Sequence, residues 1–358
     1  MDRQCDAPGG RKDGSVAVMD IFLTHSLIEK RRLSEAAAGK LGLQAASVEK
    51  DFWGCWTLRE LFTLPEFGPH FTFKGGTSLS KGWKLIERFS EDIDVVIERD
   101  FLGFGGDKAP EGAPSQKQRQ KRLEELKSTC QKVIRERLEP VLQKRFRAKI
   151  PKEFAWKLFP DPDDTDQQTL LFQYPAAFIS SDYLRPVVKI ELGARSDIEP
   201  SSMPKIQPYL AEAIPGKFKD SEFTLRTVSP ERTFWEKAML LHEETYRSGS
   251  SGPKDRLARH YYDLWCLIRK GIAAKALLDA GLFSRVADHR AIFFRKSKEA
   301  QESLRPGSLR LLPREDQGNA WKKDYEAMRE AMIFGEAPNF AEILRAVGDF
   351  ERRFNKQA

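Results

Sequence analysis

The spacing of apolar residues changes along this chain and predicts helices in some stretches and strands in others. Between residues 19 and 64, apolar positions recur at helical intervals in "MDIFLTHSLIEKRRLSEAAAGKLG" and "SVEKDFWGCWTLRELFTL". Short apolar runs at "HFTFKGG", "DIDVVIE", "TLLFQYPAAF" and "RPVVKIELGAR" predict strands, and apolar and charged residues alternate in the last run. From about residue 226 onward the pattern is again helical. These elements predict the α/β (α+β) class, with a mixed sheet flanked by helices.

The order of these elements divides the chain into three predicted parts. Residues 1–17 are expected to form a disordered leader, because "MDRQCDAPGGRKDG" lacks the apolar stretch of a signal peptide. Residues 18–225 are expected to form a core with N-terminal helices and a basic helical insert, and residues 226–358 a helical domain. A length of 358 residues also suits two domains better than one.

Positive charge is concentrated in the predicted helical insert. The chain has a net charge of +7, yet residues 116–149 carry twelve Lys or Arg against four Glu, a local net of +8. We expect this helix to follow the loop "GFGGDKAPEGAPS" and to end near Pro140 or a little later. Clustered cations suggest a polyanionic partner, because they release counterions from phosphates. The alternative is a solvated face of an ordinary helix, since apolar residues recur at helical spacing beneath the charges.

The remaining composition indicates a cytoplasmic protein with no membrane partner. No apolar run approaches the ~18 to 20 residues that a membrane span needs. The cysteines form no CxxC pair, so neither a zinc site nor a disulfide framework is indicated, and a reducing compartment fits best.

A Gly-Gly turn marks the first candidate for chemistry. A predicted strand leads into Gly75 and Gly76, and a helix is predicted from Thr77 to Glu87. Glycine lets the backbone approach an anion closely, and the N–H groups of a helix N-terminus attract phosphate. The hydroxyls of Thr77 and Ser78 could cap the helix or contact phosphate oxygens. A Gly-Gly pair alone is more often only a turn, and the spacing is not that of a Walker A loop.

Two aspartates in the next predicted strand strengthen the phosphate interpretation. Asp92 and Asp94 point to the same face of a strand, while Ile93 and Val95 point into the core. Adjacent carboxylates repel each other, and such a pair persists when a divalent cation lies between them. Their hard oxygen ligands suit Mg²⁺ or Mn²⁺. The alternative is two solvated aspartates on an edge strand.

These residues carry a resemblance to a known family. The run "KGGTSLSKGW...RFSEDIDV" resembles the AbiEii/AbiGii toxin family of the polymerase-beta-like nucleotidyltransferase superfamily. "VEKDFW" and "YLRPVVKIELGAR" are similar to its upstream helix and its later strand, and "SPERTFWEKAMLLHE" and "RHYYDLWCLI" to its two C-terminal helical motifs. The resemblance covers roughly residues 45–270 and implies a nucleotidyltransferase-like fold.

The resemblance also implies roles for particular residues. It makes Asp92, Asp94 and Glu191 metal ligands and catalytic residues, where Glu191 would otherwise be a solvent-facing acid on a half-buried strand. The resemblance assigns nucleotide binding to the residues of the glycine motif and to a lysine of the later helix. These residues are Lys74, Gly75, Gly76, Thr77, Ser78, Lys81 and Lys237.

The two C-terminal motifs supply the last candidates. Ser229 and Pro230 are expected to begin a helix, as N-cap and first-turn proline. Lys237 lies on the flank of that helix's apolar stripe, where a lysine commonly extends to solvent. The resemblance makes it a phosphate ligand and a catalytic residue. It also makes Asp263 a catalytic-site residue, acting either as a base or as an orienter of Lys237. Without the resemblance, Asp263 would be an i, i+4 partner of Arg259.

The function implied by the resemblance is NMP transfer from an NTP by an Mg²⁺-dependent enzyme. The acceptor would be an RNA, for example the 3′ end of a tRNA, and the protein would be the toxin of a toxin–antitoxin or phage-defence pair with an antitoxin partner. Two alternatives remain. One is transfer to a small molecule, which needs no extended basic surface. The other is a nucleotide-binding regulatory module without catalysis, which need not keep two metal ligands and a phosphate lysine.

Overall fold

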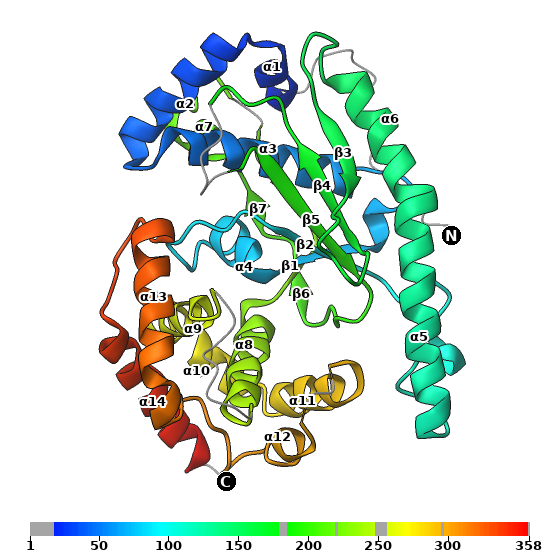
Figure 1. The fold of residues 1–358 in the computed structure, drawn as a ribbon, viewed down its shortest axis with the longest axis vertical. Helices are drawn as coiled ribbons and strands as arrows, with labels where there is room; N and C mark the ends of the chain where they lie inside the picture. The colour runs from blue at the N-terminus through cyan, green and yellow to red at the C-terminus, as the bar shows by residue number, and fades with distance from the viewer. Residues whose placement is uncertain (1–17, 179–184, 219–220, 248–255, 295–296, 357–358) are drawn as a thin grey trace, which may run out of the picture.

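The computed structural model describes residues 18–178, 185–218, 221–247, 256–294 and 297–356. The leader predicted for residues 1–17 therefore lies outside the described residues. The fold is α/β, with a seven-stranded mixed sheet and many helices, so the predicted fold class is confirmed (Figure 1). No helix in the described ranges is long and apolar enough to cross a membrane.

The sheet has the strand order β3-β4-β5-β2-β1-β9-β6. Its strands are β1 Phe71–Lys74, β2 Ile93–Ile97, β3 Lys157–Pro160, β4 Thr169–Gln173, β5 Val187–Gly193, β6 Ser201–Ser202 and β9 Thr227–Val228. All four predicted strands are present, whereas β3 and the two-residue strands were not predicted. Strand β2 runs antiparallel to β1 and parallel to β5. This register places Asp94 between Lys74 and Glu191.

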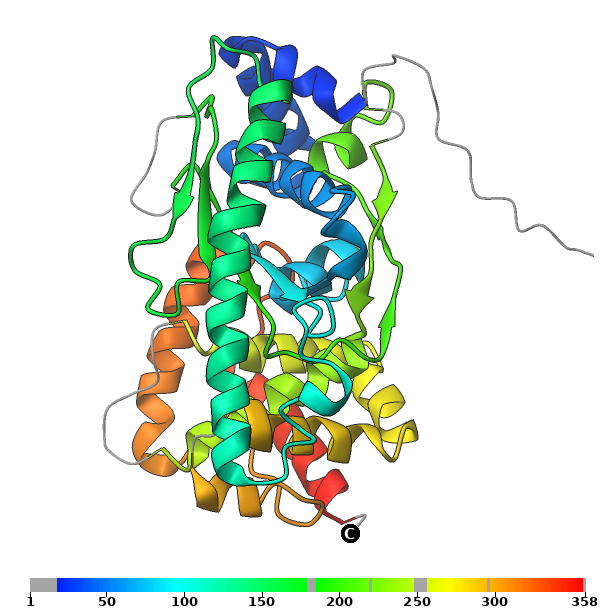
Figure 2. The same ribbon diagram turned by 90° about the vertical axis from the view of Figure 1, so that its right-hand side faces the viewer.

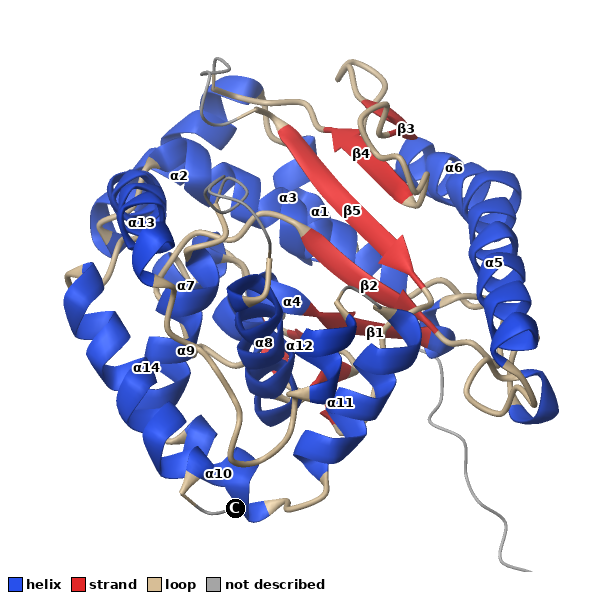
Figure 3. Cartoon of the chain, turned by 60° about the horizontal axis from the view of Figure 1, so that its bottom comes forward, coloured by secondary structure: helices blue, strands red, loops and turns tan. Residues whose placement is uncertain are grey.

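Helices α1 (Val18–Thr24), α2 (Leu27–Leu41) and α3 (Ala45–Phe62) confirm the helical prediction for the N-terminal segment. Helix α2 begins with a capping box, in which Ser26 and Glu29 satisfy each other's backbone N–H groups. Helix α3 packs on the sheet, because Trp53 and Trp56 contact the ring of Phe172 on β4. Figure 3 shows α3 behind β5, on the face of the sheet away from the viewer.

The basic segment forms one long helical column beside the sheet (Figure 2). It consists of α5 (Gln116–Val133), a π-helical turn (Ile134–Leu138) and α6 (Glu139–Lys149). Pro140 does not interrupt the column, because it lies in the first turn of α6, directly after the π-helical turn. The preceding residues 103–115 form the expected loop, apart from a short 3₁₀ turn at Gly106–Lys108.

Helices dominate the C-terminal part, as predicted. They are α8 Pro230–Thr245, α9 Arg259–Arg269, α10 Ile272–Leu278, α11 Leu282–Phe293, α12 Lys298–Glu302, α13 Gly318–Met332 and α14 Phe340–Asn355. The Ser229 side chain accepts a hydrogen bond from the Arg232 N–H and Pro230 occupies the first turn of α8, which confirms the predicted helix start. The small α7 (Tyr209–Ala213) and the two-stranded sheet of β7 (Lys205–Ile206) and β8 (Phe223–Thr224) precede these helices.

The buried apolar residues form two clusters. The first is built from the N-terminal helices and the sheet, and the second mainly from α8 to α14. Leu79 and Ile86 join the second cluster, while Phe293 joins the first. Because the two cores exchange residues, the domain boundary at residue 226 stays a prediction.

The helix predicted from Thr77 to Glu87 is wrong in both its start and its length. The helical turn begins at Gly75, continues as a π-helix over Ser78–Gly82 and ends there. Lys84 adopts a left-handed φ of 52°, and the following segment pairs with the end of α13 through an Arg88–Ile333 bridge. Tertiary pairing with a distant part of the chain therefore replaces the local helix.

Candidate active site

A cavity of about 400 Å³ lies where strands β1, β2 and β5 meet helices α8, α9 and α11. The sheet side contributes Lys74, the two glycines of the turn and the three predicted carboxylates. The helical side contributes mainly cationic and imidazole groups: Lys237, Arg259, His260, His289 and Arg290. Arg88 enters from the segment between the glycine turn and β2. The sheet side, called here the acidic wall, thus carries most of the acids, and the helical side, called the basic wall, most of the cations; Lys74 and Glu236 are the exceptions.

The three predicted carboxylates lie together on the acidic wall. Asp94 and Glu191 are register partners on the parallel strands β2 and β5, so their side chains leave the same face. Burial and the neighbouring Glu191 raise the pKa of Asp94 to about 8. Burial and Glu191 likewise raise the pKa of Asp92. Burial opposes ionisation of Glu191, but Lys189, whose Nζ lies 2.7 Å from Glu191 Oε1, holds the pKa of Glu191 below its ordinary value.

These groups fit a hard divalent cation. In the described part of the chain, no three His, Cys, Asp or Glu side chains surround a common point in the way that metal ligands do. Asp92, Asp94 and Glu191 nevertheless line one cavity and offer only oxygen donors. Burial, and after it the charge of Glu191, raises the pKa values of Asp92 and Asp94, so their charged forms are disfavoured without a cation. A cation placed among the three side chains would remove this repulsion.

The glycine turn is shaped by its close approach to Asp94. Gly75 has a φ of +81°, and a Cβ built on it would lie 1.9 Å from Asp94 Oδ2. A Cβ on Gly76 would lie 2.7 Å from Arg88 Nη2 and 2.8 Å from Ser90 Oγ. Both glycines therefore allow side chains of the acidic and basic walls to approach the backbone of the turn.

Gly75→Ala should remove activity and lower stability by roughly 1–3 kcal/mol, because it strains the backbone and displaces the Asp94 carboxylate. Gly103→Ala is the matched control: Gly103 has a φ of +82°, but nothing lies within 4 Å of the position that a Cβ would take there. Turnover and thermal unfolding are measured on both variants. We expect the control to lose comparable stability and keep its activity. Equal activity in the two variants would show that the contact with Asp94 is unimportant.

The hydroxyls and the second lysine of the glycine motif are engaged elsewhere. The Thr77 hydroxyl bonds the Asp92 carbonyl and Ser90, and the Ser78 hydroxyl donates to the Gly75 carbonyl at 2.8 Å. Lys81 is buried, with its Nζ 2.9 Å from Asp51 Oδ1 and above the ring of Tyr209. None of the three lines the cavity. The structure thus gives Thr77 and Ser78 a part in holding the turn, and places Lys81 in a structural ion pair.

The basic wall is organised by Asp263. This aspartate is fully buried and does not line the cavity. It accepts two hydrogen bonds from Arg88, at 2.7 and 2.8 Å, and Lys237 Nζ lies 2.8 Å from its Oδ2. Although burial opposes it, the charges of Arg88 and Lys237 hold the pKa of Asp263 far below its usual range. Such a carboxylate is a poor proton acceptor, so this geometry favours the orienting role over the base.

Lys74 and Lys237 both line the cavity, as expected for nucleotide ligands. Lys74 Nζ lies 2.7 Å from Ser196 Oγ and 3.7 Å from Glu236. Burial and the nearby Arg88 lower the pKa of Lys237 despite the opposing charge of Asp263. Burial, Lys237 and Arg259 hold the pKa of His260 well below its ordinary value, so its neutral ring accepts from Lys237 Nζ at 3.4 Å.

Five cationic or imidazole residues of the cavity were not predicted from the sequence: Arg88, Arg259, His260, His289 and Arg290. Arg88 stands in the quoted run "RFSEDIDV", and its signal was an arginine just before the Asp-x-Asp strand. Arg259 and His260 open the motif "RHYYDLWCLI" at the start of α9, on the turn nearest to Lys237. Nothing in the sequence around Arg259 and His260 distinguishes them from exposed polar residues at the start of an ordinary helix.

Comparisons with known proteins address the identity of this site. The sequence model described as "Nucleotidyl transferase AbiEii toxin, Type IV TA system" matches residues 56–346, which include all residues that line the cavity and both C-terminal motifs. The chain belongs to the AbiEii nucleotidyltransferase toxin family. It is therefore a nucleotidyltransferase toxin of a type IV toxin–antitoxin system, and the family implies an NTP substrate and an antitoxin partner.

Other comparisons add little to this family assignment. Among solved structures, MenT4, a nucleotidyltransferase toxin from Mycobacterium tuberculosis H37Rv, is similar at 16% identity with a TM-score of 0.45, over 92% of this chain and 90% of that chain. A search of the curated proteins found no match.

Proposed function

We propose that this AbiEii family member transfers an NMP from an NTP to a hydroxyl group of an RNA acceptor, for example the 3′ end of a tRNA. The observation that carries the proposal is the pairing of the two walls. Carboxylates that suit Mg²⁺ face lysine and arginine side chains that suit a triphosphate, across one cavity of about 400 Å³. Protection against phage, which the sequence also suggests, stays part of the proposal.

In the proposed reaction, the acceptor hydroxyl attacks the α-phosphorus of the NTP. A bond forms between the acceptor oxygen and the α-phosphorus, the bond to the β-phosphate oxygen breaks, and pyrophosphate leaves with the electron pair. The proton of the hydroxyl passes to one of the carboxylates at the site. When Mg²⁺ is bound by Asp92, Asp94 and Glu191, it would supply charge stabilisation for the pentavalent transition state and polarise the attacking oxygen.

The cationic residues would bind and align the triphosphate. Arg88 and Lys237 are held by one buried carboxylate, so their charges are fixed before the nucleotide arrives. Arg259 lines the cavity and has no ion-pair partner in the described part of the chain, which leaves its guanidinium available for a phosphate. The Gly75–Gly76 turn would bring backbone N–H groups close to the same phosphates.

Lys237→Ala should raise the KM for the NTP and lower kcat, because a charge on the triphosphate acts in both the ground state and the transition state. We expect kcat/KM to fall on the order of 10²-fold. The fold should persist, since Asp263 keeps its two bonds to Arg88. Lys275→Ala, at an exposed lysine of α10 without an ion pair to any described residue, is the matched control. Normal kinetics for Lys237→Ala would leave this lysine with a structural role only.

The experiment that tests the proposal is incubation of the protein with each labelled NTP, Mg²⁺ and total RNA. We expect label in an RNA band with one NTP and pyrophosphate as the second product. Label in a small-molecule fraction without labelled RNA would favour the small-molecule acceptor. Nucleotide binding without any transfer would favour the regulatory module.

A further inference from the structure

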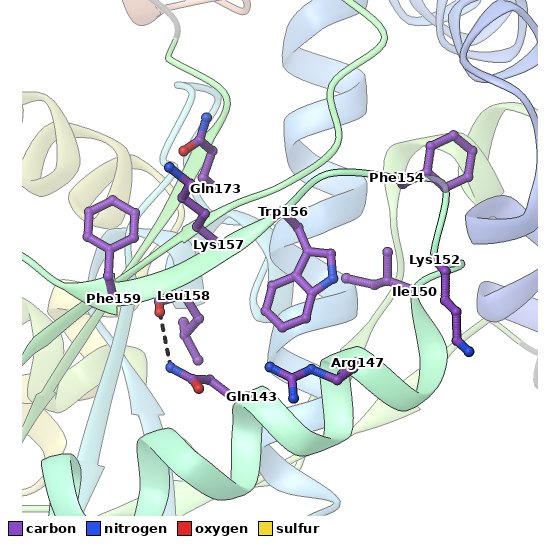
Figure 4. Close-up of a pocket in the computed structure, with 10 residues that line it drawn as sticks. All are labelled: Gln143, Arg147, Ile150, Lys152, Phe154, Trp156, Lys157, Leu158, Phe159 and Gln173. Atoms are coloured by element: carbon purple, nitrogen blue, oxygen red, sulfur yellow. Dashed lines mark hydrogen bonds between the residues drawn. The ribbon is translucent and has the colours of Figure 1, made fainter.

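A second, larger concavity of about 680 Å³ lies outside the cavity just described. It runs between helix α6, strand β3 at the edge of the sheet, and the loop that joins them (Figure 4). Three cations and three aromatic rings dominate its lining: Arg147, Lys152, Lys157, Phe154, Trp156 and Phe159. We call this concavity the edge groove.

The cations of the edge groove are not neutralised by the protein. Other cations of the basic column point back onto the fold and pair with acids: Lys127 with Asp166, Arg137 with Glu66, Arg145 with Glu60, and Lys149 with Asp20 and Glu60. By contrast, Arg147, Lys152 and Lys157 are exposed, and none of them has an ion-pair partner in the described part of the chain. Of these three cations only Arg147 belongs to the basic segment predicted from sequence, and other exposed cations of that segment, such as Lys117 and Lys144, also lack an ion-pair partner among the described residues. Glu153 is the acid of the loop that adjoins the groove.

The aromatic rings of the groove are only partly used by the core. Trp156 meets Phe146 and Phe172 edge to face, and its indole lies in the middle of the groove above Arg147 (Figure 4). Phe159 is half-buried and contacts no other described aromatic ring. Half-exposed rings beside unpaired cations are the elements of a surface that stacks bases and binds the phosphates between them.

Strand register links the edge groove to the carboxylates of the active site. Directly opposed residues of neighbouring strands share a face, and Thr169 of β4 opposes Glu191 of β5. Because side chains alternate along each strand, Gln173 on β4, and its partner Lys157 on β3, lie on this same face. Phe159 lies two residues from Lys157 and shares the face as well.

This face gives a direct path between the two sites. Lys157 lies two strands and four residues from Glu191, which corresponds to ~10 Å across the sheet and ~13 Å along it. A strand of stacked nucleotides at ~3.4 Å each would cover that path with on the order of five nucleotides. The opposite face carries Leu158, Phe172 and Ile190 and is closed by the core.

We infer that the edge groove binds unpaired nucleotides of the acceptor RNA, so that the terminal hydroxyl reaches the carboxylates while the preceding nucleotides cross β5 and β4. This inference rests on the proposed function, because it names the path of the RNA into that active site. On the face of the carboxylates, Phe159 stacks a base, Lys157 binds a phosphate and the exposed Gln173 amide lies within reach of a base edge. Trp156, which meets Phe172 of the opposite face, and Arg147 bind the nucleotides that continue around the edge of β3 (Figure 4). A peptide added to the edge of β3 is a poorer occupant, since the strand has four residues and ends in Pro160.

The test measures RNA binding by the full-length protein without NTP, using fluorescence anisotropy. The probes are two labelled RNA hairpins, one with a 3′ tail of ~8 unpaired nucleotides and one with a blunt end. The variants are Phe159→Leu, which keeps apolar bulk but loses the ring, and the double reversal Arg147→Glu with Lys157→Glu. Phe159→Tyr keeps the ring, and Lys275→Glu with Arg305→Glu reverses two exposed charges without ion pairs to described residues elsewhere on the surface.

We expect Phe159→Leu to weaken binding of the tailed hairpin about fivefold or more, the loss of one stacked base. The double reversal should weaken it more and reduce the slope of log K against log salt by ~0.7 for each lost phosphate contact. Phe159→Tyr and the distant reversal should bind like wild type, and the blunt hairpin should respond to none of the groove variants.

Two results would overturn the inference. They are an unchanged affinity of the groove variants for the tailed hairpin, and equal losses of affinity for the tailed and the blunt hairpin. Because RNA binding is measured without NTP, the inference about the edge groove can be rejected even if the protein transfers NMP to RNA. Conversely, absence of transfer by wild type would reject the proposed function while leaving the tail-dependent binding measurable.

Discussion

Asp94→Asn should abolish NMP transfer, with an expected loss of at least about 10³-fold in kcat, corresponding to ~4 kcal/mol of transition-state stabilisation from a metal site. Asp94 is half-buried at the centre of the acidic wall, between Glu191 on β5 and the glycine turn. An amide offers a divalent cation a neutral oxygen and no charge, so the affinity for Mg²⁺ should fall together with the rate. Transfer assays and a thermal-shift titration with Mg²⁺ measure the two effects.

The fold of this variant should not suffer. Asp94 and Glu191 are adjacent carboxylates in a ladder, and burial raises the pKa of Asp94 to about 8, so the metal-free protein already disfavours its charged form. An asparagine resembles the protonated acid and removes the repulsion. We therefore expect the Tm without metal to stay the same or rise, and the Mg²⁺-dependent increase in Tm to be lost.

Asp288→Asn, at an exposed position of α11, is the control. It should change neither the rate of transfer nor the Mg²⁺-dependent increase in Tm. If Asp94→Asn retained transfer, or if Mg²⁺ stabilised it as strongly as wild type, the assignment of Asp94 as a metal ligand would be wrong. Growth arrest of cells that express the Asp94→Asn variant would also contradict the assignment of Asp94 as a metal ligand.

The acidic wall could be predicted from sequence because its geometry is local. A period of two along a strand puts Asp92 and Asp94 on one face, and the alternation in the β5 run puts Glu191 opposite to the buried aliphatic residues. Only the parallel register that makes Asp94 and Glu191 neighbours needed the structure. The strands themselves were predictable for the same reason, whereas β3 and the two-residue strands lack enough alternation to give a signal.

The resemblance supplied Lys237 and Asp263 of the basic wall, but the place of Arg88 could not be predicted because it depends on a contact that is distant in sequence. Arg88 and Asp263 are 175 residues apart, and nothing in the local pattern of either residue indicates the other. Lys81 is a different case. The resemblance makes it a nucleotide ligand, whereas in the structure its ammonium lies against Asp51 of α3 and it does not line the cavity.

The same reason explains the helix that was predicted to continue to Glu87. Its local sequence favours a helix, but backbone bonds between Phe89 and Met332 and between Phe334 and Glu87 tie this segment to the end of α13. That pairing fixes the approach of Arg88 to the cavity. A local preference was therefore overridden at the position where the active site needs an extended chain.

Asp263→Ala should be the most destabilising single substitution at the site, with an expected loss of about 3–5 kcal/mol in the free energy of unfolding. Asp263 is fully buried, and its two oxygens hold Arg88 and Lys237. Without the carboxylate, two buried cations would face each other with no compensating charge. Urea unfolding followed by circular dichroism measures the loss, and NMP transfer should disappear because Arg88 and Lys237 are no longer positioned.

Asp279→Ala is the matched control, because Asp279 pairs with Arg285 at 2.6 Å while both side chains are about half exposed. Removal of an exposed ion pair costs ~1 kcal/mol or less. The pH dependence supplies an independent check. The neighbouring cations hold the pKa of Asp263 far below its ordinary value, so its stabilisation is present above the unfolded pKa of about 4 and is lost only as the pH falls towards the lower folded pKa. The difference between wild type and Asp263→Ala should therefore be constant from about pH 5 to 8 and shrink in stronger acid.

A triple variant separates positioning from mere structural support. In Asp263→Leu with Arg88→Met and Lys237→Met, the buried charges are replaced together by apolar side chains of similar volume, a change that is often neutral or stabilising. We expect this variant to recover most of the stability lost in Asp263→Ala and none of the activity. Recovered activity would mean that the cluster only supports the fold. If the triple variant lost both stability and activity, the packing around Asp263, rather than its charge, would hold α9 against the glycine turn and β2.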